Sequence, residues 1–371
     1  MDPELKADLV KLSREIHGSP ELAYQEHKAV AAIGRLLAKY GHQMERPYGG
    51  LETAFRSRIG PKTGPFVALL AEYDALPDVG HGCGHNLIAM SNVGAFLLAA
   101  KQATDLQIGI ELIGTPAEES GGGKLDLLDA GVFTDAVAVL SSHPGGNWWG
   151  VGQTTLGIMN MKIGFHGLAS HAAESPEKGK NALSAAISMF VAIDAWRQHL
   201  PSDARVHGII TNGGAAANII PSYAEAVIGL RSPDLTFLHE MVKKFKKICE
   251  GAALQHDCTV EVTEEMRLYE PTTPDPMLTD ILVKELERLG AKDVRAGNLV
   301  TASTDLGNIS QRYPTTAIGF PVSTESVAGH SIKMTEASVT DYAHDASEKT
   351  AEAMAAVAVR MGRDKSARLG R

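Results

Sequence analysis

The stretch PFVALLAEYDALPDVGHGCGHNLIAM, residues 65–90, decides how this chain folds. It begins with an apolar run at 66–71, whose length suits a fully buried strand. A helical pattern follows at about 86–101. A buried strand leading into a helix is typical of an α/β layer with a largely parallel sheet. Ligands of such sheets sit beyond the carboxyl ends of the strands, so the polar residues between strand and helix are functional candidates.

Apolar runs on either side predict that the same layer continues along the chain. Two amphipathic helices are expected before Gly41, and further buried strands at 107–113 and 136–140. The alternation resumes late in the chain, with a helix at 276–289, a strand at 315–320 and a final helix at about 338–361. We therefore predict a large α/β domain with a largely parallel sheet.

The middle of the chain has a different rhythm and predicts a second domain. Its elements follow the order β-α-β-β-α-β, at about 157–165, 179–199, 206–210, 223–230, 235–254 and 258–263. This order is the ferredoxin-like split motif, which buries a core of its own. Pro271, Pro274 and Pro276 then punctuate the chain as a linker would. The predicted division is a large domain, 1–155 and 268–371, interrupted by an inserted domain, 156–267.

Composition narrows the function classes. Hydrophobic residues make up 44% of the 371 residues, enough to build a substantial core, and the formal net charge is −9. The acidic balance and the lack of a basic stripe argue against a nucleic-acid partner. No apolar run is long enough to cross a bilayer, and the first residues do not resemble a signal peptide, so we expect a cytoplasmic protein without membrane contact. Three cysteines do not make a disulfide framework.

Metal-ligand residue types gather where the predicted strands end. Cysteine, histidine and carboxylate side chains are the ligands of zinc-like metals. The clusters are Glu72-Tyr73-Asp74 with His81-Gly82-Cys83-Gly84-His85, then Glu118-Glu119, Ser142-His143, and Gly329-His330. Gly84 allows a tight turn of the backbone, so that the side chains of Cys83 and His85 can face one point. Of the adjacent glutamates, one can bind metal while the other acts as a general base toward water.

Each cluster also has an ordinary structural explanation. A single histidine after a strand is more often a hydrogen-bonding residue than a ligand, and paired glutamates are usually solvated. The segment Gly121–Lys124 suggests a phosphate loop, but Leu125 stands where serine or threonine is needed and the glycine spacing is wrong. The coincidence of four ligand-type clusters at strand ends is what favours a metal site.

At this point the residues resemble a known family, the dinuclear-metal amidohydrolases and peptidases that include aminoacylase and carboxypeptidase G. The segments 72–77 and 80–86 are most similar to the Cys-Gly-His branch, near the p-aminobenzoyl-glutamate hydrolases. The resemblance covers nearly the whole chain. It implies a zinc-exopeptidase-like α/β/α catalytic domain with an inserted ferredoxin-like α+β domain, which acts as a lid and a dimerisation module.

The resemblance also implies a set of site residues. The metal ligands are Cys83, His85, Glu119, His143 and His330. Glu118 is the general base, which also carries the proton to the leaving amine. Asp74 supports the centre from behind. Glu72 stands where other branches have a histidine ligand, a departure for which His85 is expected to compensate.

In the inserted domain the resemblance extends to Ser170-His171-Ala172-Ala173 and its surroundings. His171 then corresponds to a catalytic histidine that donates to the oxyanion in the partner subunit's site. Asn218 and Arg231 match residues that bind substrate, and a guanidinium suits a carboxylate because it makes two parallel hydrogen bonds. The structural alternative for Arg231 is an ion pair at the end of its strand. Ser303–Asn308 also fits the family, with a role in shaping the substrate pocket.

The expected activity is hydrolysis of the amide bond in a small N-acyl or N-aroyl amino acid or a dipeptide that carries a carboxylate. Two divalent cations, zinc or manganese, and a homodimer through the inserted domain are expected on the resemblance. Three alternatives stay open: deamination of an aromatic amine, a thiol hydrolase with Cys83 as nucleophile, and a binding protein without catalysis. Loss of activity on chelation separates the metal enzyme from the thiol enzyme.

Overall fold

The computed structural model describes residues 1–364 and separates them into two compact units. Of these residues, unit 1 contains 1–154, 272–300 and 304–364, and unit 2 contains 155–271 and 301–303. The chain therefore leaves unit 1 after Thr154 and re-enters it at Thr272. The segment 156–267, predicted to be an inserted domain, lies within unit 2.

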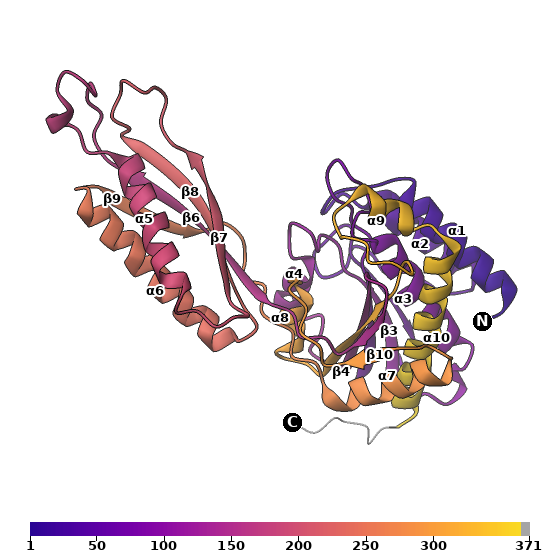
Figure 1. Ribbon diagram of the computed structural model, residues 1–371. Helices are drawn as coiled ribbons and strands as arrows, with labels where there is room; N and C mark the ends of the chain where they lie inside the picture. Colours follow the sequence, from indigo (N-terminus) through magenta and orange to yellow (C-terminus); the bar gives the residue numbers. More distant parts are fainter. Residues whose placement is uncertain (365–371) are drawn as a thin grey trace. The chain divides into compact units, whose positions relative to one another are not determined.

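Unit 1 is built on a seven-stranded sheet (Figure 1). The strands follow the order β1-β3-β2-β4-β11-β5-β10. β2, β3, β4 and β11 run parallel, whereas β1 and β5 each run antiparallel to their neighbours β3 and β11. The bounds are β1 Phe55–Ile59, β2 Phe66–Ala71, β3 Gly109–Gly114, β4 Ala136–Pro144, β5 Trp149–Val151, β10 Val294–Ala296 and β11 Thr315–Phe320.

Alternate residues of the central strands enter two separate cores. Val67 and Leu69 of β2 join the larger core, which α1, α2, α3, α7 and α10 cover. Phe66 and Ala68 join a smaller core with α4 and α8. The period of two arises because successive side chains of a strand point to opposite faces. The helices are α1 Pro3–His17, α2 His27–Lys39, α3 His85–Ala100, α4 Gly123–Asp129, α7 Pro276–Arg288, α8 Leu306–Ser310, α9 Ile332–Ala337 and α10 Asp341–Arg363, with a short 3-10 turn at Ala103–Asp105. Unit 1 is thus the predicted α/β/α sandwich.

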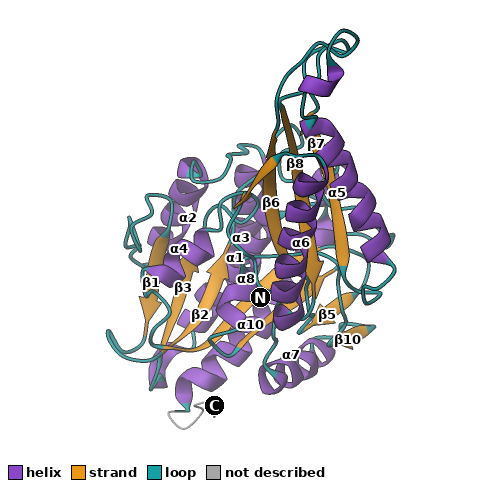
Figure 2. Ribbon diagram, turned by 90° about the vertical axis from the view of Figure 1, so that its left-hand side faces the viewer, coloured by secondary structure: helices purple, strands orange, loops and turns teal. Residues whose placement is uncertain are grey.

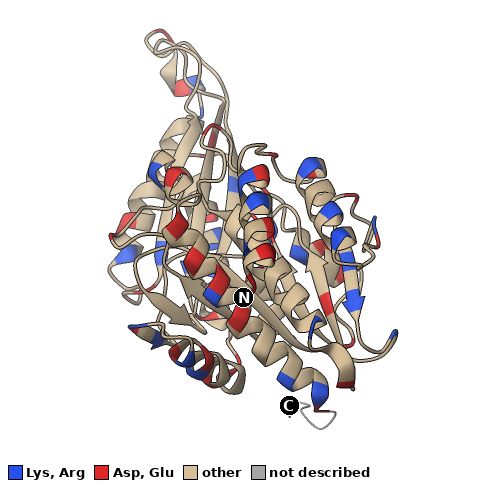
Figure 3. Ribbon diagram, turned by 90° about the vertical axis from the view of Figure 1, so that its right-hand side faces the viewer, with Lys and Arg blue, Asp and Glu red and all other residues tan. Residues whose placement is uncertain are grey.

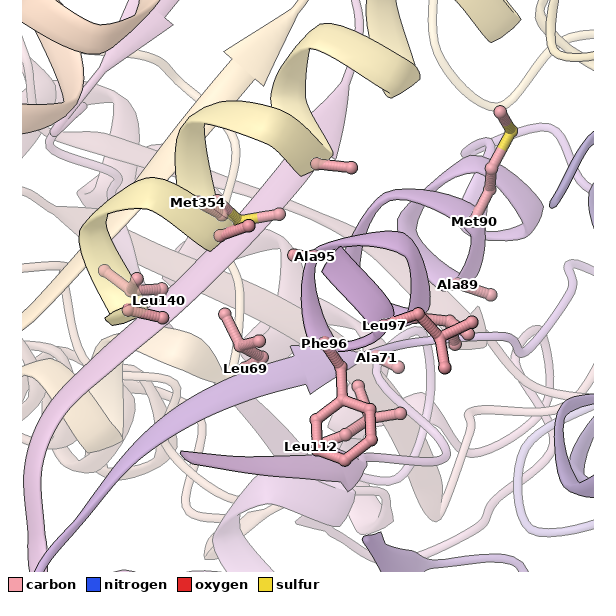
Figure 4. Close-up of a cluster of buried hydrophobic side chains, with 14 of the residues drawn as sticks. Leu69, Ala71, Ala89, Met90, Ala95, Phe96, Leu97, Leu112, Leu140 and Met354 are labelled. Atoms are coloured by element: carbon pink, nitrogen blue, oxygen red, sulfur yellow. The ribbon is translucent and has the colours of Figure 1, made fainter. Parts of the chain in front are cut away.

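The larger core fixes helix α3, which begins at His85. Figure 4 shows Leu112 of β3 beside Phe96 of α3, in a cluster that also contains Leu69 of the neighbouring strand β2 and Met354 of α10. All four side chains are fully buried. Each such burial stabilises the fold by about 1.5–3 kcal/mol. The position of the first turn of α3 is therefore set by packing along the whole helix.

Helix α7 shows how the outer surface is patterned. Its buried stripe is Leu278, Leu282 and Leu286, spaced four residues apart. The outer face carries charges of both signs (Figure 3), with an ion pair between Asp280 and Lys284. Such exposed i,i+4 pairs contribute only about 0.3–0.5 kcal/mol, so the apolar stripe determines how the helix docks.

Unit 2 is a ferredoxin-like α+β fold, as the order of its elements predicts (Figure 2). Its antiparallel sheet has the order β7-β8-β6-β9. Helices α5 and α6 pack on this sheet around a core of their own. The bounds are β6 Gly157–His166, α5 Ala182–Arg197, β7 Arg205–Asn212, β8 Tyr223–Ser232, α6 Leu235–Gln255 and β9 Thr259–Glu264, with a 3-10 turn at Pro176–Lys178.

One helix boundary differs from the sequence prediction for a visible reason. The final helix is expected from about 338, but α10 begins at Asp341, because the Thr340 side chain caps it by accepting from the Ala343 N–H; α9 precedes it as a separate short helix. Residues 1–364 include no helix with both the length and the hydropathy that a bilayer crossing requires.

Candidate metal centre

The candidate centre lies at the carboxyl ends of three parallel strands of unit 1. Glu72 and Asp74 follow β2, Glu118 and Glu119 follow β3, and His143 is the penultimate residue of β4. Parallel register brings the ends of β2 and β3 side by side, with Ala71 opposite Gly114. The sheet therefore gathers these side chains at one edge, where α/β folds bind ligands.

Gly84 places the two residues beside it. It caps α3 in a left-handed conformation with φ +78°. A Cβ atom at this position would lie 2.7 Å from Cγ of Pro144 and 2.9 Å from Cε of Met334. A side chain would thus be both strained and sterically excluded. The turn directs Cys83 and His85 toward the same cluster.

His330 reaches the cluster from a loop distant in the sequence. Its backbone N–H donates to the carbonyl of Gly82 over 2.8 Å, which ties the loop to the Cys-Gly-His turn. Its φ is +56°, an uncommon conformation for a residue with a side chain. The Nε2 atom lies 3.5 Å from Oε2 of Glu119.

The structure brings all five predicted ligands together. Donor atoms of Cys83, His85 and His143 lie within 4.8 Å of one another, and so do those of Cys83, Glu119 and His330. The two groups share the Cys83 sulfur. A third group of the same kind contains Glu72, His85 and Glu118, which the sequence analysis did not count as a ligand set.

Hydrogen bonds fix the tautomers of two histidines. The Nδ1 atom of His85 lies 2.8 Å from Oδ1 of Asp74, and Nδ1 of His143 lies 2.8 Å from the carbonyl of Pro144. Both oxygens accept, so Nδ1 carries the proton in each ring and Nε2 presents its lone pair to the cluster. Metal-ligating histidines are usually oriented in this way. Asp74 also accepts from the Glu119 N–H, over 3.0 Å, through its other oxygen.

Three buried acceptor atoms in the cluster have no hydrogen-bond partner among residues 1–364. They are Oε2 of Glu72, Nε2 of His85 and Oε1 of Glu119. The His85 atom is 3.5 Å from the Glu72 oxygen and 3.7 Å from the Glu119 oxygen. Buried polar atoms are rarely left without a partner, and three that converge on one point suit a cation. The donor set therefore fits a divalent metal.

The cluster has a buried floor and an exposed rim. Glu72, His85 and Glu118 are buried. Cys83 and Glu119 are partly exposed, and His143 and His330 are exposed. A molecule from the solvent would therefore approach the cluster from the side of His143 and His330.

Local electrostatics distinguish the thiol from the general base. Burial raises the pKa of the Cys83 thiol to about 12. Catalytic thiols have lowered pKa values, so this environment does not favour a thiol nucleophile. Burial, together with the charges of Glu72 and Asp305, raises the pKa of Glu118 well above its ordinary value. A raised pKa makes the Glu118 carboxylate a stronger proton acceptor than an ordinary glutamate.

Lys124 is a neighbour that the sequence analysis did not assign to the site. It is fully buried, and its Nζ atom is 2.8 Å from Oε1 of Glu72. Burial alone would lower its pKa, but the charges of Asp305 and Glu72 outweigh burial and raise it. The only feature of the sequence that distinguished Lys124 was the run of glycines before it, which was set aside because it does not match the pattern of a phosphate loop.

The predicted residues of unit 2 lie on two loops and a strand. The backbone of His171 pairs with that of Ile219, and the Ala172 N–H donates to the Asn218 carbonyl over 2.9 Å. The loops that carry His171 and Asn218 are thus joined. Nδ1 of His171 accepts from the N–H groups of Ala173 and Glu174, at 3.2 and 3.1 Å. In the neutral ring the proton is therefore on Nε2, which is left as a donor.

Arg231 is a half-buried cation of unit 2 without a carboxylate partner among the described residues. Its Nε atom is 3.1 Å from Nε2 of His207, and its Nη1 atom donates to the Ser303 hydroxyl over 3.1 Å. Burial lowers its pKa, and no acidic group offsets that effect. Among the residues that the structure describes, the strand-end ion pair considered for Arg231 is not formed.

Comparison with solved structures supports the fold. A dinuclear metal-binding peptidase of the M20 family from Bacillus subtilis has a TM-score of 0.75 at 21% identity, covering 96% of this chain and 99% of that one. An aminobenzoyl-glutamate utilization protein from Klebsiella pneumoniae has a TM-score of 0.71 at 19% identity, covering 98% of each chain.

Relatives in sequence are more similar. The Xaa-Arg dipeptidase of Mus musculus is 37% identical over 94% of this chain and 84% of its own length. A p-aminobenzoyl-glutamate hydrolase chain of Escherichia coli is 30% identical over 81% of this chain and 67% of its own length. The model of peptidase family M20/M25/M40 matches residues 68–357. With the fold, the clustered donor atoms and these likenesses in agreement, the chain belongs to peptidase family M20/M25/M40.

Proposed function

We propose that this protein hydrolyses the amide bond of a dipeptide or a small N-acyl or N-aroyl amino acid with a free carboxylate, and that it uses two divalent cations, zinc or manganese. The substrate class follows the relatives, which are named for Xaa-Arg dipeptides and for p-aminobenzoyl-glutamate. In both, an amide bond lies next to an amino acid carboxylate.

The observation that carries this proposal is that buried atoms of Glu72, His85 and Glu119 without hydrogen-bond partners among residues 1–364 converge within a cluster of metal-ligand side chains. Cys83, His85 and His143 would hold one cation, and Cys83, Glu119 and His330 the other. Divalent cations at such a centre polarise the scissile carbonyl and make water more acidic. Asp74 keeps His85 and Glu119 in place by accepting an N–H from each.

Glu118 is the proposed proton carrier. Its Oε2 atom lies 4.0 Å from Nε2 of His85, so its carboxylate adjoins the donor cluster. It takes a proton from the attacking water and returns that proton to the nitrogen of the leaving amine. The raised pKa of Glu118 favours the first of these transfers, in which the carboxylate accepts a proton.

The residues of unit 2 are proposed to complete the reaction. The N–H at Nε2 of His171 donates to the oxyanion as negative charge develops there. Arg231, which has no carboxylate partner of its own among residues 1–364, pairs with the carboxylate of the substrate. Asn218 supplies a further polar contact to the substrate.

The test combines metal content with turnover. Protein purified without added metal is analysed for bound elements, and hydrolysis of Xaa-Arg dipeptides, N-acyl amino acids and p-aminobenzoyl-glutamate is followed before and after chelation. We expect about two zinc or manganese ions per chain and chelator-sensitive release of a free amino acid. Ammonia release from an aromatic amine without amide cleavage, or activity that survives chelation, would contradict the proposal.

Glu118→Gln separates chemistry from metal binding. The change removes the proton acceptor and keeps the shape of the side chain, so we expect activity to fall by about 10²–10⁴-fold with metal content unchanged. Glu52→Gln is the matched control, because Glu52 is an exposed residue outside the donor cluster. Full activity in the metal-loaded Glu118→Gln protein would exclude Glu118 as the base.

A homodimer through unit 2 is the proposed assembly. Within the described residues β7 is an edge strand that pairs only with β8. Its Ile209 side chain is 65% exposed, and Ile187 and Val191 of the adjoining α5 are 49% and 64% exposed. Unpaired strand edges with apolar side chains readily pair with another chain. Two copies that join through β7 would cover this surface.

Mixing two inactive variants tests both the dimer and the role of His171. If His171 serves the site of a second copy, a mixed dimer of Glu118→Gln and His171→Ala chains contains one intact site. We expect activity to appear on mixing, and sedimentation velocity to show a dimer that Ile209→Lys disrupts. Leu254→Lys, on the exposed side of α6, is the control. A monomer in solution would contradict the assembly.

A further inference from the structure

Lys124 is a buried cation that the proposed reaction leaves without a task. Its side chain is 0% exposed. Its ammonium group is paired on one side with Asp305 and on the other with Glu72, whose Oε1 atom is 2.8 Å away. A lysine is almost never fully buried unless it is paired, because its charge loses the solvation of water. Here the pairing leads directly to a carboxylate of the donor cluster.

The position of Lys124 is fixed by its local backbone. A Cβ atom on Gly123 would lie 2.0 Å from the carbonyl oxygen of Pro116, so only glycine permits this close approach. Gly122 caps α4 in a left-handed conformation with φ +76°. Asp305 then holds residue 124 twice, because one oxygen accepts from its backbone N–H over 3.1 Å and the other pairs with its ammonium. Gly122, Gly123 and Asp305 thus all position Lys124.

The contact with Lys124 restricts the carboxylate of Glu72. One of its oxygens, Oε1, is occupied by Lys124. The other, Oε2, is buried without a hydrogen-bond partner among residues 1–364 and is 3.5 Å from Nε2 of His85. Glu72, His85 and Glu118 place donor atoms within 4.8 Å of one another. A carboxylate held in this way offers a single oxygen in a fixed direction.

We propose that Lys124 is a positioning residue that holds Glu72 as a further ligand of the metal centre, with Oε2 as the ligating atom. This rests on the proposed function, since it requires cations at the centre. Glu72, Glu118 and Asp305 are buried close together, and like charges repel. The ammonium of Lys124 offsets this repulsion and keeps Glu72 turned toward His85.

Cobalt(II) binding to the full chain provides a readout that is independent of turnover. Absorbance from a cysteine-thiolate–cobalt bond reports loading at Cys83, and competition with a chromophoric chelator gives the affinity of each binding step. We expect Glu72→Gln and Lys124→Met each to weaken one step by about 10–100-fold, as removal of supporting groups around a metal does. The thiolate band should still form. Lys101→Met, at an exposed lysine paired with Asp2, is the matched control and should bind as the unchanged protein does.

A double-mutant cycle distinguishes positioning from a merely structural ion pair. If Lys124 acts through Glu72, the protein with Lys124→Met and Glu72→Gln together binds cobalt no more weakly than Glu72→Gln alone. Additive losses would show that Lys124 acts by another route and overturn the proposal. Cobalt affinities of Glu72→Gln equal to those of the unchanged protein would overturn the ligand assignment.

If the Lys124→Met protein does not fold, a second variant tests the proposal. The variant that combines Lys124→Met with Asp305→Asn removes one positive and one negative charge, so the net charge of the buried group is unchanged. It should show the same weakened step, and unchanged affinity would overturn the proposal. If the unchanged protein bound no cobalt and gave no thiolate band, the proposed function itself would fail. That result is distinct from normal binding that is insensitive to Glu72.

Discussion

Replacing Asp74 with asparagine tests whether the metal centre depends on the groups that orient its ligands. Asp74 is fully enclosed and uses its two oxygens separately: one accepts from Nδ1 of His85 over 2.8 Å and the other from the N–H of Glu119 over 3.0 Å. Asparagine has nearly the same shape but only one accepting oxygen. Its NH₂ group must face one of these two donors.

Each orientation of the new amide is costly. If the NH₂ group faces Glu119, two donors oppose each other and the backbone N–H is left unsatisfied, which costs about 1–3 kcal/mol. If it faces His85, the ring must move its proton to Nε2, and the lone pair that points to the cluster is lost. We therefore expect metal affinity to fall by about 10–100-fold. This corresponds to about 1.4–2.8 kcal/mol.

Competition of zinc or cobalt between the protein and a chromophoric chelator measures this change. Asp78→Asn is the matched control, since Asp78 is an exposed residue of the same loop whose φ of +64° suits asparagine as well as aspartate. Circular dichroism and thermal unfolding of the metal-free proteins establish that both are folded. Affinity within twofold of the unchanged protein would refute the claim that Asp74 orients these ligands.

Gly84→Ala should lower the free energy of unfolding by about 1–3 kcal/mol through its left-handed backbone alone, and by more through contact with Pro144; urea unfolding of the metal-free protein measures it. Burial, assisted by Arg14, lowers the pKa of His344 to about 4. The stability that this group contributes is complete above its unfolded pKa of about 6.5 and is lost as the pH falls toward 4, so His344→Leu should flatten that decline in urea titrations; an unchanged slope would be contrary to this. Arg231→Lys should raise KM by about 10–100-fold for carboxylate substrates, because one ammonium cannot replace a two-pronged guanidinium, whereas equal KM values would exclude the carboxylate role.

The sequence predicted the central strands well and the edge strands poorly. The apolar runs at 66–71 and 315–320 coincide with β2 and β11, because buried strands are uninterrupted apolar segments. β1 is not among the predicted strands. Its five residues, FRSRI, are alternately buried and partly exposed, so the strand does not form the continuous apolar run by which β2 and β11 are recognised. β5 and β10 have three residues each, too few for any period to be visible.

The grouping of the candidate ligands could be predicted from the sequence where these residues follow predicted strands or belong to the Cys-Gly-His turn. The buried polar residues that contact them, Lys124 and Asp305, could not be predicted. Lys124 and Asp305 are 181 positions apart. Lys124 lies in the first turn of α4 and Asp305 immediately precedes α8, so only the packing of these two short helices brings them together. Without the fold, the glycines before Lys124 indicated only a turn. The unpartnered oxygen of Glu72 is equally invisible in the sequence, because it is a property of packing.

The graded burial of the donor atoms has a kinetic consequence. Each of the two proposed ligand groups combines enclosed and exposed side chains, because His85 and Cys83 are at least partly buried whereas His143 and His330 are exposed. A cation held by either group would have one ligand at the solvent boundary, so it should exchange with the medium without unfolding of the protein. The metal found in the purified protein should then follow the solution in which the protein is handled rather than the metal present when the chain folded.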